Sequence, residues 1–326
     1  MRYRFLKNFL KDTNGWVMSH PLIRDDTCPW NLRARPFPWK IWVIPGKRSR
    51  TRRQPLVFQN LSDSFNGRFG GHAGNSTELR TFSSGQETGI ENTVRGGCYR
   101  SRWLRDLCIS QDVNDVMASI YQTEISPHTM PVHLGHLNYQ PSKLEEAVDK
   151  WHHDTIPLDY VMMVSDPATL SGGGFEYFLG TKMEAEELSK QGKTPPRDRV
   201  KAPKFPGPGY AVALHGNMVV HRGATLTKPG ERITMVNAYV SMDCLVDDQS
   251  RSRDLIGIDD PGALYAEWAK HVSWRTQNRL KQIIDSMAFD QEPDQVLDQL
   301  EFAANDLLKT INDMKAGPRE AQHYEQ

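Results

Sequence analysis

The stretch Trp151-His152-His153-Asp154-Thr155-Ile156-Pro157 brings two histidines and a carboxylate together within seven residues. Side chains alternate between the two faces of a strand, so His152 and Asp154 share one face and His153 takes the other. If His153 were a metal ligand, its neighbours on the same face would be Trp151 and Thr155, and neither suits iron(II). The alternation therefore selects His152 and Asp154 as candidate ligands.

Three later residues extend this candidate site. His221 supplies a second imidazole, and two imidazoles with one carboxylate can hold iron(II) by one face and leave the opposite face open. Arg232 and Thr234 are two apart in a strand-like run from 232 to 242, so a guanidinium and a hydroxyl can grip one carboxylate together. The alternatives are hydrogen-bonded structural roles for the histidines and a surface ion pair for Arg232.

The ordered set resembles the 2-oxoglutarate and iron(II)-dependent oxygenases. Members of that family carry His-x-Asp, a distal His, and an Arg about ten residues later on a double-stranded β-helix. Here ten residues, 222–231, separate His221 from Arg232, and Arg232-x-Thr234 is similar to the family's Arg-x-Ser/Thr. The resemblance covers about 132–242, and the phrases within it look similar to small-molecule oxygenases of microbial, particularly fungal, secondary metabolism.

The resemblance implies a role for each residue. His152, Asp154 and His221 would bind Fe(II), and Arg232 and Thr234 would bind the distal carboxylate of the co-substrate 2-oxoglutarate. Asn138, on the preceding strand, would orient 2-oxoglutarate or make a structural hydrogen bond. Dioxygen would oxidise a small organic substrate, by hydroxylation in the simplest case, with release of succinate and CO2. Related halogenases carry a small residue at the carboxylate position, so Asp154 disfavours halogenation.

Two other functions remain open on the sequence. One is a non-catalytic jelly-roll binding protein, and the other is a cupin-like iron enzyme that does not use 2-oxoglutarate. Neither the substrate nor the outcome of oxidation, whether hydroxylation, desaturation, cyclisation or epoxidation, can be read from the residues.

The expected fold class is mainly β with flanking helices around a double-stranded β-helix (jelly roll) core. One catalytic domain would span 61–326, with the core at about 130–243 and a helical C-terminal region at 261–316. Helices are expected at 99–107 and 110–121, and a short one from Ser142. The charged and proline-rich segment 181–208 would be an insertion, either a lid or a surface loop. The expected strands are 130–139, 150–154, 158–164, 175–180, 210–215, 218–222 and 232–242.

Composition excludes several partners. With 40 basic and 40 acidic residues, no nucleic acid is expected, and no apolar run is long enough to cross a membrane. Basic residues concentrate in 1–60, which is expected to be a poorly ordered extension; a nuclear address at 47–53 and a mitochondrial transit peptide are the alternatives. The four cysteines lack metal-site spacing, so free thiols and a cytoplasmic location are expected.

A last pattern concerns partners of the same chain. An apolar stripe recurs at helical spacing near the C-terminus, and it would either pack against the core or form a homodimer. Its members are Val296, Leu300, Ala303, Leu307, Ile311 and Met314.

Overall fold

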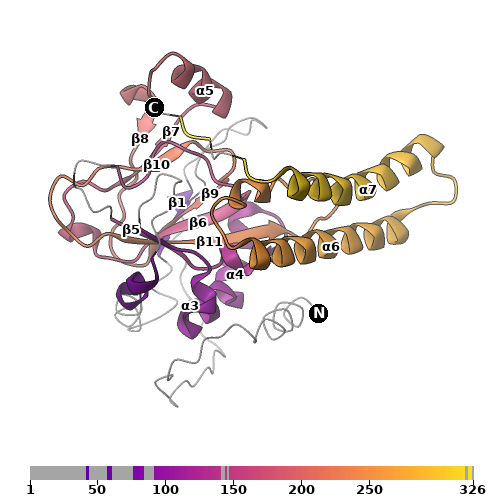
Figure 1. Ribbon diagram of the computed structural model, residues 1–326, viewed down its shortest axis with the longest axis horizontal. Helices are drawn as coiled ribbons and strands as arrows, with labels where there is room; N and C mark the ends of the chain where they lie inside the picture. Colours follow the sequence, from indigo (N-terminus) through magenta and orange to yellow (C-terminus); the bar gives the residue numbers. More distant parts are fainter. Residues whose placement is uncertain are drawn as a thin grey trace.

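The computed structural model describes residues 76–83, 92–140, 144, 147–319 and 322–324, together with the backbone of two strands at 42–43 and 57–60. Two antiparallel sheets form the centre of the molecule, and helices lie below and to one side of them (Figure 1). No helix in these described ranges is long and apolar enough to cross a membrane.

The larger sheet has the order β1-β2-β9-β6-β11-β5-β3, with β4 paired to the far end of β11. Every neighbouring pair is antiparallel, and the long strand β11 pairs with β5 through 233–236 and with β6 through 234–239. The strands are β1 (Trp42–Val43), β2 (Val57–Asn60), β3 (Thr93–Val94), β4 (Ile125–Pro127), β5 (His136–Tyr139), β6 (Leu158–Met163), β9 (Tyr210–Leu214) and β11 (Ile233–Ser241).

The smaller sheet has the order β10-β7-β8, formed by β10 (His221–Gly223), β7 (Phe175–Phe178) and β8 (Val200–Lys201). Val161 and Val212 of the larger sheet meet Phe175 and Tyr177 of the smaller one in a single buried cluster. Two antiparallel sheets packed face to face in this way make a jelly roll, which confirms the expected fold class.

The strand period decides what lies on each face of the larger sheet. Ile233 and Met235 of β11 are buried on the outer face, together with Leu104 and Met117 of two helices. These helices are α3 (Arg102–Cys108), capped by Ser101, and α4 (Gln111–Tyr121). Thr234 and Val236 alternate with the outer residues and therefore face the interior between the sheets.

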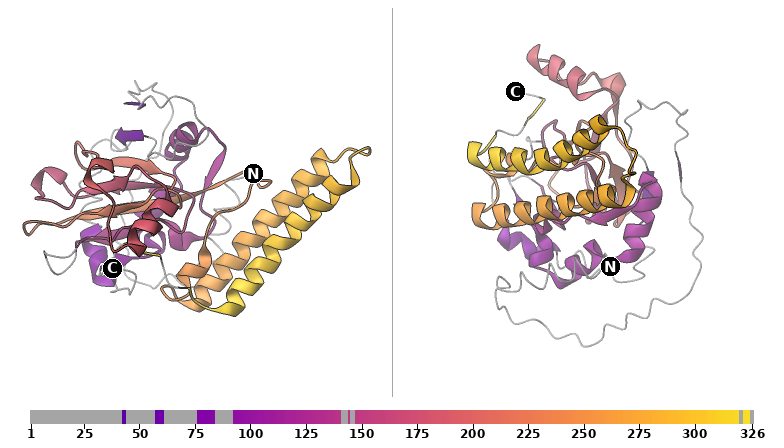
Figure 2. Two further views of the ribbon diagram at one scale, coloured as in Figure 1. Left: turned by 90° about the horizontal axis from the view of Figure 1, so that it is seen from above. Right: turned by 90° about the vertical axis from the view of Figure 1, so that its right-hand side faces the viewer.

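Two long helices, α6 (Pro261–Ser286) and α7 (Pro293–Ala316), form an antiparallel hairpin. Both begin with proline at the first turn, where the missing N–H costs no hydrogen bond. The base of α6 is anchored to the domain through Leu264 and Trp268, which pack on Met130 and Leu255. The rest of the hairpin projects beyond the sheets (Figures 1 and 2).

Several expected elements need correction. The strand expected at 130–139 is a short 3-10 turn (Pro131–His133) followed by β5, and the segment 150–154 forms only isolated bridges, both at His152. Within 181–208 lies α5 (Lys182–Lys190), which starts at a capping box of Thr181 and Glu184. The helix expected from Ser142 lies largely outside the described residues.

The N-terminal extension expected at 1–60 also changes. Its residues 57–60 form β2, which pairs with β9 in the larger sheet, and residues 42–43 pair with β2. The sheet therefore recruits backbone from a region that composition alone assigned to a tail. The basic segment 47–53 and Cys28 lie outside the described residues, whereas Cys98, Cys108 and Cys244 are buried free thiols.

Candidate metal centre

Backbone pairing brings the metal-ligand candidates together. His152 and His221 exchange two backbone hydrogen bonds, of 3.0 and 2.9 Å, so their side chains leave adjacent chain segments side by side. The amide of Asp154 donates to the carbonyl of Gly216 at 2.9 Å, which fixes the carboxylate end of the motif. The site is thus built at the edge of the smaller sheet, where β10 begins.

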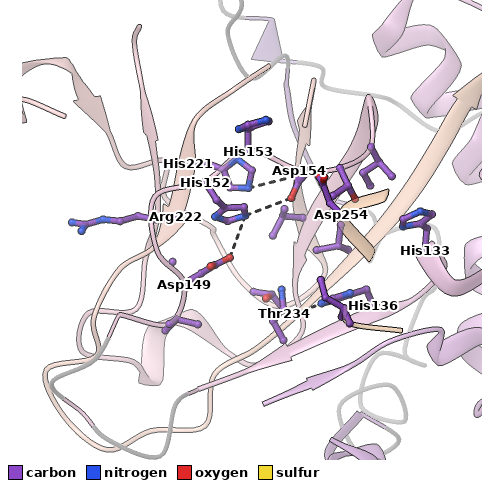
Figure 3. Close-up of a pocket in the computed structure, with 18 of the residues that line it drawn as sticks. His133, His136, Asp149, His152, His153, Asp154, His221, Arg222, Thr234 and Asp254 are labelled. Atoms are coloured by element: carbon purple, nitrogen blue, oxygen red, sulfur yellow. Dashed lines mark hydrogen bonds and ion pairs between the residues drawn. The ribbon is translucent and has the colours of Figure 1, made fainter. Parts of the chain in front are cut away.

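The three side chains converge on one point (Figure 3). His152 Nε2 lies 3.5 Å from Asp154 Oδ1, and His221 Nε2 lies 3.5 Å from Asp154 Oδ2. One ligand atom from each residue lies within 4.8 Å of the others. This separation suits three atoms that coordinate a common ion, since metal–ligand bonds are about 2.0–2.2 Å.

Hydrogen bonds at the other ring nitrogens prepare both histidines for a metal. His152 Nδ1 donates to Lys150 O at 2.7 Å, and His221 Nδ1 donates to Val219 O at 2.9 Å. In the neutral ring this leaves the Nε2 lone pair directed toward Asp154. Asp154 Oδ2 has no hydrogen-bond partner although it is buried, as expected for an atom whose partner is a metal ion. The donor set therefore fits a divalent cation.

The charges of the empty ligand set favour cation binding too. Burial lowers the pKa of His221 to about 4, which keeps this ring neutral at physiological pH. Burial alone would also lower the pKa of His152, but Asp149 and Asp154 raise it to about 10. The same histidines hold the pKa of Asp154 well below its usual range, against the effect of burial. A metal ion must therefore displace a proton from His152, so affinity should rise with pH.

Two further carboxyl groups that the sequence reasoning missed flank the site. Asp149 Oδ2 lies 3.2 Å from His152 Nε2, and burial raises the pKa of Asp149 to about 6. Asp159 is fully buried behind Asp154, and burial together with the Asp154 charge raises its pKa well above the usual range. Neither stands at the spacing that selected Asp154, so only the folded chain reveals them.

Arg232 and Thr234 lie in the same pocket as the three ligands, at the start of β11. The buried Arg232 guanidinium is held by Nε donation to Gly173 O at 2.6 Å, and its Nη1 approaches Thr234 Oγ1 at 3.5 Å. Burial lowers the pKa of Arg232 to about 10, so it stays charged at neutral pH. Gly173 has a φ of +69°, and a Cβ there would meet Leu226 at 2.7 Å, so only glycine presents this carbonyl without strain.

Asn138 also lines the pocket, opposite Thr234 in the pairing of β5 with β11. Its Oδ1 accepts from His136 Nε2 at 2.5 Å, and His136 Nδ1 accepts from Arg95, which binds Asp259 by two hydrogen bonds. This chain of contacts fixes the Asn138 amide through its oxygen and leaves its nitrogen as a further hydrogen-bond donor. Long-range contacts of this kind left no signal in the sequence.

The C-terminal segment 322–324 completes one wall of the site. His323 bridges His152, and the Tyr324 amide donates to Trp151 O at 2.7 Å. Tyr324 is buried beside Trp151, and its hydroxyl lies 2.7 Å from His153 Nδ1. His153 is therefore engaged away from the metal ligands, in line with the choice of His152. No motif links residues 170 positions apart, so the sequence could not suggest this contact.

The other histidines and the segment 181–208 lie apart from the three ligand atoms. His133 and His136 line the pocket without approaching the three ligand atoms, and His215 packs against Tyr121. Residues 181–208 contribute nothing to the pocket wall, and α5 packs through Ala185 on Trp151 and Phe178. This packing favours a surface insertion over a lid.

Gly216 gives a first testable prediction, because the two carboxyl groups press against it. A Cβ at this position would lie 1.9 Å from Asp159 Oδ2 and 2.8 Å from Asp154 Oδ2. Gly216→Ala should push Asp154 out of place and weaken divalent-metal binding roughly 10- to 100-fold. Titration of the metal-free protein with Fe(II) under argon measures this, and Gly174→Ala, which meets nothing within 4 Å, is the control. Equal affinities for the two variants would contradict the positioning of Asp154 by Gly216.

The jelly roll brings two imidazoles and one carboxylate together beside a buried arginine. These groups define a candidate mononuclear metal centre. No family model matches the chain, and no curated protein matches it in sequence. Among solved structures, it is similar to the non-heme alpha-ketoglutarate-dependent epimerase SnoN from nogalamycin biosynthesis, with a TM-score of 0.43, 13% identity, and coverage of 58% of this chain and 80% of that one.

Two other similar structures contain bound ligands. EctD from S. alaskensis, with 2-oxoglutarate and 5-hydroxyectoine, gives a TM-score of 0.41 at 13% identity over 57% of this chain and 72% of that one. HygX from Streptomyces hygroscopicus, with nickel and 2-oxoglutarate bound, gives a TM-score of 0.41 at 12% identity, with coverage of 57% of this chain and 82% of that one. At this distance the function is inferred from the chain's own residues.

Proposed function

We propose that this protein is a non-haem iron(II) and 2-oxoglutarate-dependent oxygenase that hydroxylates a small organic substrate with release of succinate and CO2. The observation that carries the proposal is the convergence of His152, Asp154 and His221 in one pocket with Arg232 and Thr234. Two imidazoles and a carboxylate on one side of an ion leave its other positions for exogenous ligands.

Each part of the site has a distinct task in this proposal. The three ligands hold the iron, and Asp154 also balances part of its charge in a buried setting. The planar guanidinium group of Arg232 can donate two parallel hydrogen bonds to the distal carboxylate of 2-oxoglutarate, and the Thr234 hydroxyl can donate another. When bound, iron and 2-oxoglutarate supply the oxidising power for attack on an unactivated carbon.

The pocket itself favours a small substrate. Its cavity is about 160 Å³ and is lined by the metal ligands, Arg232, and apolar side chains such as Val161 and Phe175. In such a mixed lining, polar groups can orient a ligand and apolar groups can help to exclude water from the reacting centre. Screening metabolites for substrate-dependent succinate release would identify the substrate class.

The central test uses purified full-length protein under anaerobic conditions. Adding Fe(II) and then 2-oxoglutarate should produce a weak visible charge-transfer band, because a 2-oxo acid that chelates iron(II) creates this transition. Admitting air should then give slow uncoupled formation of succinate. Zn(II) in place of Fe(II), and succinate in place of 2-oxoglutarate, are controls in which no band should develop.

The outcomes separate the competing functions. Protein that binds Fe(II) but gives neither the band nor succinate would rule out the proposed reaction. Oxygen consumption by such a protein without 2-oxoglutarate would indicate a cupin-like iron enzyme. Failure to bind iron at all would leave a non-catalytic jelly-roll binding protein.

A further inference from the structure

The α6–α7 hairpin exposes apolar side chains far from the metal centre. Its distal end extends beyond the two sheets (Figures 1 and 2), while the domain packs along one side of α6, where Arg275 donates to Ser241 O and Arg279 donates to Cys244 O. The inner side of the hairpin is closed: buried Arg279 of α6 lies over the ring of Phe302, donates to its carbonyl, and pairs with Asp306 of α7. The apolar residues in question lie outside that contact.

The outer face of α7 carries a regular apolar seam. Its members alternate by three and four residues, which is the spacing of a coiled-coil interface. The stripe expected from the sequence is split by the fold: Ala303 is buried toward α6, whereas Leu300, Leu307 and Ile311 are exposed. The seam consists of Leu297, Leu300, Ala304, Leu307 and Ile311, with Leu308 beside it.

Two residues of α6 widen this face. Leu280 and Ile284 are one turn apart, and Ile284 is 75% exposed. At 100° per residue they lie on the opposite side of α6 from Leu264, His271 and Arg275, which are buried against the domain. The outer side of the hairpin therefore joins the α7 seam to an apolar strip of α6.

The exposed apolar area of this face indicates that it binds a partner. The exposed parts of its side chains amount to several hundred Å², more than monomers usually expose and close to the roughly 800 Å² per partner of a stable interface. Leu297 is 57% exposed and Leu308 is 55% exposed, so most of this area would be newly buried on association.

The charges along α7 indicate which partner fits. Residues 290–301, at the distal end, contain five acidic residues and no Lys or Arg, and Lys309 and Lys315 lie toward the other end. A second copy that packs antiparallel about a twofold axis at Ala304 would place the acidic segment 290–301 opposite residues 307–318, which carry Lys309 and Lys315 and one acidic residue, and would place Leu297 opposite Ile311. The acidic distal end would be repelled by an anionic membrane.

We infer that this face binds a second copy of the chain, so that two hairpins pack antiparallel into a four-helix dimer. The small side chain of Ala304 at the centre lets the two α7 helices approach closely, and the twofold operation places Leu297 against Ile311 and Leu300 against Leu308. This inference is independent of the chemistry at the metal centre.

Light scattering coupled to size-exclusion chromatography tests the dimer directly on the full chain. Wild-type protein should have twice the 37.2 kDa mass of one chain, and Leu300→Arg with Leu307→Arg should give monomers. Met183→Arg is the control, because Met183 is also an exposed apolar residue but lies on α5. Circular dichroism shows whether each variant is folded. A wild-type monomer at 100 µM, or a dimer that survives the double substitution in folded protein, would overturn the inference.

Cysteine crosslinking tests the orientation. Ala304→Cys should form an intermolecular disulfide under mild oxidation, since the two copies meet at this residue. Leu297→Cys should not, because its partner in an antiparallel pair is Ile311. Efficient crosslinking through Leu297→Cys would show parallel packing and overturn the arrangement. Co-sedimentation of wild-type protein with phosphatidylglycerol vesicles, combined with a monomeric mass, would instead identify a membrane surface as the occupant.

Discussion

Asp154→Ala should reduce Fe(II) affinity by about 100-fold or more and abolish succinate formation. Asp154 is the only carboxylate whose two oxygens each face one histidine Nε2 among the described residues, at 3.5 Å on both sides. Removing it takes away one of three protein ligands and the negative charge that offsets the cation. The loss should exceed the 10- to 100-fold typical of residues that only support a ligand. Anaerobic titration with Fe(II) measures the effect.

Asp149→Ala is the matched control, because Asp149 also contacts His152 Nε2, at 3.2 Å. It lies outside the group of three ligand atoms, so its removal should cost far less iron affinity. If Asp149→Ala lost the metal and Asp154→Ala retained it, the carboxylate ligand would be misassigned. Thermal unfolding of both metal-free variants checks that neither has lost its fold.

Arg232→Ala should raise the concentration of 2-oxoglutarate needed for half-maximal activity about 100-fold while leaving Fe(II) affinity nearly unchanged. A buried guanidinium makes charge-assisted hydrogen bonds of about 1.5–3 kcal/mol each, and two of them account for this factor. Arg232 is fixed by Gly173 O and lies beside Thr234, and it is not one of the three metal ligands. The measurement compares the 2-oxoglutarate dependence of succinate formation with direct iron titration.

A shortened co-substrate distinguishes recognition from structural damage. Pyruvate keeps the 2-oxo acid group but lacks the distal carboxylate, so wild-type protein should prefer 2-oxoglutarate strongly and Arg232→Ala should prefer it much less. Arg222→Ala is the control, since Arg222 sits next to His221 but pairs with Glu176 and stacks on Trp151. Unaltered discrimination in Arg232→Ala would remove this residue from co-substrate binding.

Local regularities allowed much of the fold to be predicted. The period of two along 232–242 placed Thr234 and Val236 on one face and Ile233 and Met235 on the other, and the structure shows the same division. Pro261 and Pro293 marked the starts of the two long helices, where proline costs nothing. The predictions of secondary structure failed where pairing with distant backbone determines it. Residues 57–60, for example, pair with β9 in the larger sheet.

The sequence likewise predicted only part of the candidate site. Strand parity separated His152 from His153, and the structure engages His153 with Tyr324 instead. Parity can apply although 150–154 is not a regular strand, because His152 forms bridges to both His221 and His323. Asp149, the Arg95–His136–Asn138 chain and the C-terminal wall were missed, since each depends on contacts between residues without a shared motif.

By itself, the sequence determined the residue types of a candidate three-ligand metal site and the alternation that puts His152 and Asp154 together, because side-chain direction in an extended chain is a local property. Only the tertiary structure decided that His221 closes the group, that Arg232 is buried beside it, and that α7 turns its leucines outward. These depend on sheet pairing and helix packing, in which many weak contacts between distant segments act together.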